Sequence, residues 1–123
     1  MKKHGDVNIY WKDNILYLEA FGPFNEEGVI DVANKYLNSI INRDVVKFSV
    51  IEIWDEDSLS SPAGMKNVEK LWGQLEANDC TSFALVVCNS VQRAFAEPLI
   101  PSIGEIFKSR KEAEQWVLKR NST

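Results

Sequence analysis

The sequence predicts an α/β fold: one domain with a mainly parallel five-stranded sheet, an antiparallel edge hairpin and about four helices, in the order ββαβαβαβα. Three observations predict it. Two predicted strands at the N-terminus, the first with alternating apolar residues, flank a two-residue turn, and apolar runs then alternate with amphipathic segments of helical period. The 123 residues, 45% of them hydrophobic, suffice for one core without a disulfide or structural metal. There is no repeat, linker or low-complexity segment, so residues 1–123 are predicted to form a single domain.

The edge hairpin comes first in the chain. Val7, Ile9 and Trp11 alternate with more polar residues, which is the period of a strand with one apolar face. Asp13-Asn14 suits a tight turn because Asp and Asn tolerate positive φ angles. Ile15–Phe21 is then the second strand, antiparallel to the first.

A helix and the central strand follow the hairpin. Gly22-Pro23 ends the second strand, and Asn25 caps a helix whose apolar residues recur every three or four positions up to Ile41. Val45–Trp54 is the most β-favouring run of the chain and is predicted to be an interior strand. An acidic, serine-rich loop follows it.

The second half continues this alternation. Ser61-Pro62 fits a helix N-cap followed by the first helical position, where the missing N–H of proline is not needed. That helix is expected to end near Asn78-Asp79. Phe83–Cys88 is a continuous apolar run, which predicts a strand covered on both faces.

A short helix, a last strand and a C-terminal helix complete the predicted fold. Asn89-Ser90 caps the short helix. Its apolar positions are Val91, Ala94 and Phe95. Ile103–Phe107 is the last strand, and Ser109 with Glu112 forms a capping box at the start of the final helix.

Composition excludes several classes of function. The net charge of −4 argues against a nucleic-acid partner, because a phosphate backbone needs a basic face. The longest apolar run, Phe83–Cys88, is too short to cross a bilayer, so no membrane insertion is expected. Cys80 and Cys88 match no zinc or redox spacing and there is a single histidine. We therefore expect no metal, no cofactor and a reduced, cytoplasmic protein.

Two segments carry a resemblance to a known family. The hairpin ends in Phe21-Gly22-Pro23-Phe24, and the closing segment Phe107–Val117 is similar to a terminal pattern in which Phe is followed by Ala, Trp and Leu or Val. Together with the order of elements, they make nearly the whole chain resemble the SpoIIAA-like superfamily, which holds the STAS domains and Sec14/CRAL-TRIO-like small bacterial proteins. The resemblance implies a non-catalytic binding or regulatory module.

The same resemblance draws attention to the loop after the central strand. In phosphorylatable STAS proteins this loop reads Asp-Ser-Ser-Gly and carries a regulatory serine at a helix start. Leu59-Ser60-Ser61-Pro62 occupies the matching place in this sequence. The aspartate is absent and Pro62 replaces the glycine, so the resemblance assigns the phosphosite to neither Ser60 nor Ser61.

The predicted functional surface is the rim where the parallel strands end. In open α/β sheets ligands gather there, because helix N-termini present free N–H groups. We predict a ligand-binding or regulatory rim, with no catalytic residue and no metal ligand, at Phe24, Trp54, Asp55, Asp57, Ser58, Ser60, Ser61, Asn89, Ser90 and Arg93. Helix capping alone is the alternative explanation of its serines and asparagines.

Other functions stay open. The Sec14-type relatives imply a carrier of a small apolar or lipid-like ligand beneath the Gly22–Phe24 loop and Trp54. Asp55 and Asp57 superficially resemble the nucleophile and acid/base of Mg-dependent haloacid-dehalogenase-type phosphatases, but no later acidic pair completes a Mg²⁺ shell. A nucleophilic Cys88 would lack a base, so a buried structural thiol is expected there. The sequence identifies neither a protein nor a small-molecule partner, and a homodimer through an edge strand or an apolar helix face is a further alternative.

Overall fold

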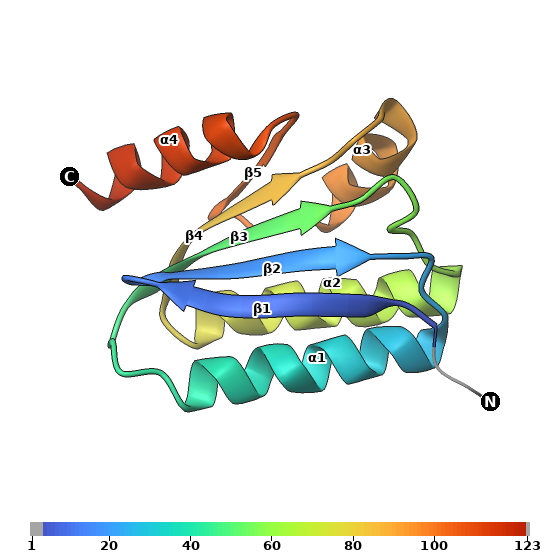
Figure 1. The fold of residues 1–123 in the computed structure, drawn as a ribbon, viewed down its shortest axis with the longest axis horizontal. Coiled ribbons are helices and arrows are strands. Elements are labelled where there is room, and N and C mark those ends of the chain that lie inside the picture. The colour runs from blue at the N-terminus through green and yellow to red at the C-terminus, as the bar shows by residue number, and fades with distance from the viewer. Residues whose placement is uncertain (1–3, 123) are drawn as a thin grey trace.

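The computed structural model describes residues 4–122 and has the predicted order of elements (Figure 1). The strands are β1 (Asp6–Lys12), β2 (Ile15–Phe21), β3 (Phe48–Trp54), β4 (Cys80–Val86) and β5 (Gly104–Phe107). The helices are α1 (Glu26–Ile41), α2 (Pro62–Ala77), α3 (Ser90–Ala96) and α4 (Arg110–Asn121), and a 3₁₀ turn, η1 (Glu97–Leu99), follows α3. The predicted fold class is confirmed. No helix of this described part is long and apolar enough to cross a membrane.

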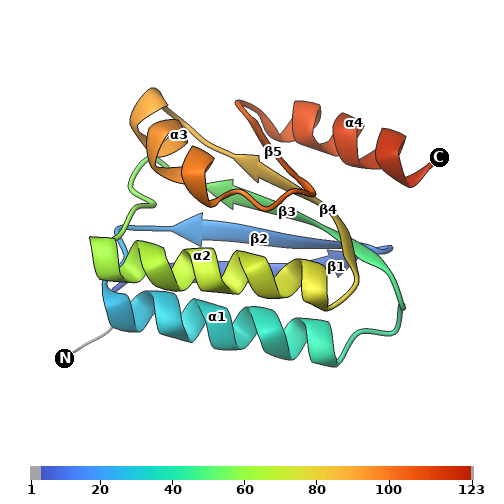
Figure 2. The same ribbon diagram turned by 180° about the vertical axis from the view of Figure 1, so that it is seen from behind.

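One five-stranded sheet organises the molecule, in the order β1-β2-β3-β4-β5. β1 is antiparallel to β2, and the other neighbours are parallel. β3 is therefore the middle strand, as predicted. Helices α1 and α2 cover one face of the sheet and α4 covers the other (Figure 1, Figure 2).

Two apolar cores flank the sheet. The larger lies against α1 and α2 and includes Leu16, Leu18, Tyr36, Phe48, Val50, Trp72, Phe83 and Leu85. The smaller lies against α4 and includes Ile15, Tyr17, Ile51, Ala84, Ala113 and Val117. Alternate residues of one strand enter opposite cores, which explains why β3 and β4 are apolar on both faces.

The predicted helix caps are confirmed. Each cap side chain accepts a hydrogen bond from a backbone N–H three residues further on, which satisfies one of the free donors of the first helical turn. The caps are Asn25, Ser61, Asn89 and Ser109.

The central strand starts later than predicted. β3 begins at Phe48 rather than Val45, and Val46 is 75% exposed. The cause is Arg43, whose guanidinium donates to the carbonyls of Ile40 and Val46. These bonds hold the residues before the strand in a turn.

The next strand starts earlier than predicted. β4 spans Cys80–Val86 instead of Phe83–Cys88. Its first residues are polar, but Ser82 lies opposite Ser49 of β3 and the two hydroxyls are 2.7 Å apart in the interior. Pairing with the neighbouring strand thus extends β4 into a segment without an apolar run.

Helix α3 turns a different face to the core than predicted. Val91 and Phe95 are 56% and 52% exposed, and Ala94 is exposed as well. Gln92 and Ala96 are fully buried instead. The reason is that the Gln92 side chain satisfies buried backbone groups that no apolar side chain can satisfy.

Candidate functional site

The predicted rim residues lie at one end of the sheet, where β3 and β4 end (Figure 1). The β3–α2 loop carries Asp55, Asp57, Ser58, Ser60 and Ser61, and Asn89, Ser90 and Arg93 follow β4. The segment before α1 reaches the same end, because the N–H of Phe24 donates to the carbonyl of Leu59 at 3.0 Å. The parallel strand order thus makes these loops neighbours.

Gln92 occupies the space between the two main loops. Its side chain is fully buried. Its Nε2 donates to the carbonyl of Asp55 at 2.7 Å, and its Oε1 accepts from the N–H of Cys88 at 2.8 Å. The Gln92 side chain therefore fills the space between the two loops and links them by hydrogen bonds.

Asp55 holds its own loop together. Its Oδ1 accepts from Ser58 Oγ at 2.6 Å and from the N–H groups of Gly22 and Asp57, both at 3.1 Å. Partial burial by itself raises the pKa of Asp55, but the three hydrogen bonds outweigh it and lower the pKa. The carboxylate thus ties the β3–α2 loop to the end of β2. Within residues 4–122, no three His, Cys, Asp or Glu side chains are grouped so that they could share a metal ion.

The remaining polar residues of the rim serve helix ends and ion pairs. Ser61 and Asn89 cap α2 and α3. Arg93 lies 3.0 Å from a carboxylate oxygen of Glu97. Ser90 is exposed at the start of α3. These contacts agree with the capping explanation of the serine and asparagine pattern.

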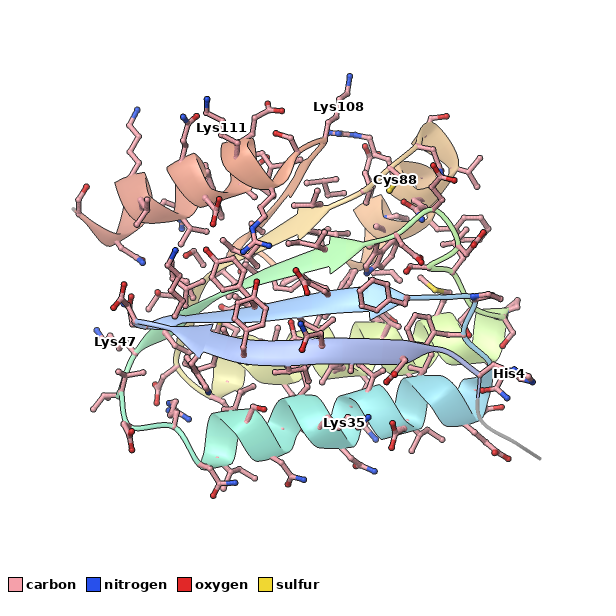
Figure 3. The ribbon with its side chains drawn as sticks, in the orientation of Figure 1. His4, Lys35, Lys47, Cys88, Lys108 and Lys111 are labelled. Atoms are coloured by element: carbon pink, nitrogen blue, oxygen red, sulfur yellow. The ribbon has the colours of Figure 1, made fainter. Side chains whose placement is uncertain are left out.

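Cys88 is exposed, contrary to the buried thiol expected from its apolar run (Figure 3). The strand ends at Val86, two residues before the end of the apolar run, so Cys88 lies in the loop after β4. Its Sγ donates to the carbonyl of Trp54 at 3.1 Å. Partial burial of the sulfur raises the pKa of Cys88 most, and the negative charges of Glu56 and Asp55 raise it further. A raised pKa makes this thiol a weak nucleophile near neutral pH.

An apolar pocket lies between the sheet and helices α1 and α2. It measures about 40 Å³, which is room for about three water molecules. Its apolar wall consists of Val7, Leu18, Ala20, Phe24, Val29, Val32, Trp54, Leu59, Met65, Val68, Leu71 and Trp72. Its polar side chains are Glu52, Ser58 and Ser60. Four residues of the predicted rim, Phe24, Trp54, Ser58 and Ser60, therefore line this pocket.

Glu52 is a buried acid in the wall of this pocket, and its side chain is held by three donors. Its Oε1 accepts from Tyr36 Oη and Trp72 Nε1, both at 3.1 Å, and its Oε2 accepts from Trp54 Nε1 at 2.7 Å. Burial raises the pKa of Glu52, and the three hydrogen bonds offset that rise only in part. Burial, and then the neighbouring Glu52, likewise raise the pKa of Tyr36 well above its ordinary value.

Ser60 supplies a second polar group. Among the described residues, its Oγ is the one buried side-chain nitrogen or oxygen without a hydrogen-bond partner. A Cβ atom at Gly64 would lie 2.0 Å from this oxygen, so glycine at that position leaves space for the hydroxyl. A buried hydroxyl without a partner costs about 1–3 kcal/mol. Ligand-binding pockets commonly combine an apolar wall with a few such polar groups.

Sequence reasoning did not include Glu52 among the site residues. It placed Trp54 at the rim and above a possible apolar pocket. Trp54 is only 5% exposed and stacks on Trp72, with ring centroids 6.0 Å apart. The signal that could have identified Glu52 is the period of two along the strand, which puts Val50, Glu52 and Trp54 on the same face.

Comparison with known proteins finds similar ones only among solved structures. No protein-family model matches the chain, and no curated protein matches it. An uncharacterised protein of the DUF3478 family from Shewanella loihica PV-4, with a SpoIIAA-like fold, shares 14% identity, with a TM-score of 0.63 over 94% of this chain and 95% of that one. The protein TM1081, solved by NMR, shares 15% identity, with a TM-score of 0.68 over 90% and 87% of the two chains.

The Bacillus cell fate determinant SpoIIAA, in its phosphorylated form, is similar as well. It shares 16% identity, with a TM-score of 0.60 over 91% of this chain and 99% of that one. The chain therefore has a SpoIIAA-like fold, and the resemblance seen in the sequence is confirmed at that level.

Proposed function

We propose that the protein is a non-catalytic binding module, which takes a small, mainly apolar, uncharged ligand with one hydroxyl group into the pocket between the sheet, α1 and α2. The observation that carries the proposal is the pair of Glu52 and Ser60 in an otherwise apolar wall. The volume suits a ligand of about four or five non-hydrogen atoms. A longer, lipid-like ligand would have to displace side chains of the wall.

Hydrogen-bonding capacity supports a hydroxyl. An ionised carboxylate has about four acceptor positions, and a protonated carboxyl has one O–H donor beside its remaining acceptor positions. Three donors already use Glu52, two on Oε1 and one on Oε2, so the free position is on Oε2. A ligand hydroxyl can donate to or accept from Glu52 at this position, according to its protonation, because a hydroxyl is both donor and acceptor. It can do the same with the Ser60 hydroxyl.

The charge of the wall supports an uncharged ligand. Among residues 4–122, no Lys, Arg or His side chain lines the pocket, so an anionic head group would meet the Glu52 acid without a compensating cation from this part of the chain. The raised pKa of Glu52 favours its neutral form, which offers little attraction to an ammonium group. Both charged classes would also lose their hydration on entry.

The hydrogen bonds that Asp55 and Glu52 already make support a binding role rather than catalysis. A catalytic acid or base must exchange a proton with a substrate within hydrogen-bond reach. Asp55 is engaged by three donors of its own loop, and Glu52 is surrounded by three donors of the core. Neither arrangement resembles a poised nucleophile beside a base.

The test is an NMR titration that follows the indole N–H signals of the four tryptophans. Trp54 and Trp72 line the pocket, whereas Trp11 and Trp116 lie outside its wall and serve as internal controls. The probes are 1-butanol, 1-chlorobutane, butyrate and butylammonium. We expect 1-butanol to shift the Trp54 and Trp72 signals most strongly and the two ions to leave them unchanged.

Ser60→Ala sharpens this test. It should weaken 1-butanol binding about two- to tenfold, the equivalent of one hydrogen bond, and leave 1-chlorobutane binding unchanged. Ser90→Ala, at an exposed site, is the matched control. The proposal is wrong if no probe moves either pocket tryptophan, or if the ions bind as well as the alcohol.

A second candidate function is a phosphorylation-controlled regulatory module. The observation that favours it is the exposed Ser61 at the start of the 16-residue helix α2, in the loop that resembles the regulatory segment of STAS proteins. One structural neighbour, SpoIIAA, was solved in its phosphorylated form. A phosphate is favourable at a helix N-terminus, and the buried Ser60 hydroxyl is less accessible to a kinase.

Mass spectrometry of the protein isolated from its own cells tests this second candidate. We expect phosphate on Ser61. Unmodified Ser58, Ser60 and Ser61 in every growth state would count against the regulatory module. We place either module in a reducing cytoplasm, which the two free thiols of Cys80 and Cys88 support.

A further inference from the structure

Within residues 4–122, no strand pairs with the outer edge of β1. The carbonyls of Asn14 and Ala20 accept hydrogen bonds from Ser49 and Asp55, on the side of β3. Even-numbered residues of β2 therefore face β3, and odd-numbered ones face β1. The β1 partners of those odd-numbered residues are Asp6, Asn8, Tyr10 and Lys12.

The other three residues of β1 must direct their backbone groups outward. These are Val7, Ile9 and Trp11. One contact supports this directly, because the N–H of Val7 donates to the Asp6 side chain at 2.8 Å and not to β2. A strand that pairs with this edge would have to replace that bond. The edge is seven residues long, contains no proline and shows no bulge in its register with β2. Natural proteins usually interrupt such an edge, since it is a template for another strand.

We propose that this edge pairs with the same edge of a second copy of the chain, antiparallel about a two-fold axis at Ile9. In that register Val7 lies opposite Trp11 of the copy, and Ile9 lies opposite Ile9. All three outward-facing residues then meet outward-facing residues, which is the condition for an antiparallel hydrogen-bonded ladder. The inference is independent of the pocket and of its ligand.

Charge selects this register over its neighbours. Asp6 and Lys12 are the two ends of β1 and become opposite one another twice, once at each end of the pair. They fall in non-hydrogen-bonded pairs, in which opposing side chains are closest. A register shifted by two residues puts Asp6 opposite Tyr10 or beyond the strand end, so it loses both charge pairs and shortens the ladder.

The faces of the strand also match. Val7, Ile9 and Trp11 pack towards the core beneath α1 and α2, and Tyr10 packs towards the α4 side. Antiparallel pairing about Ile9 keeps apolar residues opposite apolar residues on the first face. Lys35 is carried by α1 (Figure 3), and its ammonium lies 3.2 Å from Asp31 and 3.8 Å from Asp6. In the dimer the Asp6 carboxylate would therefore have a second cation near it besides Lys12 of the copy.

Charge reversal tests the register in solution. Sedimentation of the full chain should show a dimer at high concentration. Lys12→Asp or Asp6→Lys puts like charges opposite each other at both ends and should raise the dimer Kd roughly ten- to a hundredfold. The double variant Asp6→Lys/Lys12→Asp restores opposite charges and should restore the dimer. Lys108→Asp, far from this edge (Figure 3), is the matched control.

Amide hydrogen exchange gives a second readout. The outward N–H groups of Ile9 and Trp11 should become protected as concentration rises in the wild type and in the double variant, but not in the single variants. A wild type that stays monomeric at its highest soluble concentration overturns the proposal. So does a dimer that both single reversals leave intact, or a double variant that stays monomeric.

Discussion

Replacing Glu52 with glutamine changes the chemistry of the pocket wall with almost no change of shape. Glutamine has one carbonyl oxygen where glutamate has two. With that oxygen at the Oε1 position, Tyr36 and Trp72 keep their acceptor, and the N–H of Trp54 faces an NH₂ group. If the amide is flipped, the N–H of Trp72 faces the NH₂ group instead. One buried indole N–H is unsatisfied in either case, which costs about 1–3 kcal/mol of unfolding free energy.

The pH dependence separates the charge of Glu52 from its hydrogen bonds. Burial raises its pKa in the folded chain, so the folded state holds that proton more tightly than the unfolded state. The resulting stability is fully present below the ordinary glutamate pKa of about 4.3 and is lost as the pH rises towards the folded pKa, by up to about 1.4 kcal/mol per pH unit. Glutamine does not titrate. The deficit of Glu52→Gln should therefore shrink as the pH rises.

Urea unfolding followed by tryptophan fluorescence, from about pH 5 to pH 8, measures this difference. Glu69→Gln is the matched control, because it makes the same chemical change at an exposed position of α2, outside the core. A constant difference between wild type and Glu52→Gln across this range would refute the reasoning on the buried charge. A variant as stable as wild type at the acid end would refute the reasoning on the indole donors.

Five further substitutions, at Gly22 and Gly73, at Gln92, and at Ser61 and Ser60, test the packing around the site. Gly22→Ala places a Cβ 2.1 Å from the carbonyl oxygen of Asp57 and should cost about 1–3 kcal/mol in urea unfolding, whereas Gly73→Ala, with nothing near its Cβ, should stabilise α2 by about 0.5–1 kcal/mol. Gln92→Ala leaves the N–H of Cys88 and the carbonyl of Asp55 unpaired; we expect a loss of about 1–3 kcal/mol and faster exchange of the Cys88 amide, and unchanged exchange would contradict the role given to Gln92. Ser61→Ala removes the α2 cap and should lower the melting temperature through a loss of about 1 kcal/mol. Ser60→Ala should leave stability unchanged or raise it. A Ser60→Ala variant less stable than Ser61→Ala would contradict the absence of a partner for the Ser60 hydroxyl.

Local chemistry explains which parts of the fold could be predicted. Caps such as Asn25 and Ser61 act within three residues of themselves, so the sequence alone indicates them. The start of β3 depends on Arg43, whose guanidinium also reaches the carbonyl of Asn78 at 3.2 Å, 35 residues away. No local pattern contains that contact. Boundaries set by such long-range bonds are therefore where the prediction failed.

The sequence could predict where the loops of the candidate site lie, but not which of its side chains point into the core. The parallel order of strands correctly brings the loops of Ser60 and Asn89 to one end of the sheet. It says nothing about the direction of a side chain relative to the helices, and that direction decides whether Trp54 borders solvent or the core. Glu52 could be placed on the same face as Trp54 from the period of two. Its donors could not, because Tyr36 and Trp72 come from two different helices.

The arrangement around Glu52 also bears on why the chain retains a buried acid. A network that only fixed the packing of α1 and α2 on β3 would be complete with the three donors that Glu52 already has. Such a network gives no reason for a space beside it, nor for the unpaired Ser60 hydroxyl in the same wall. Both features lower stability, since a void loses packing contacts and an unpaired hydroxyl loses its hydration. A ligand hydroxyl would remove both costs at once, which is why we attribute the acid to binding as well as to folding.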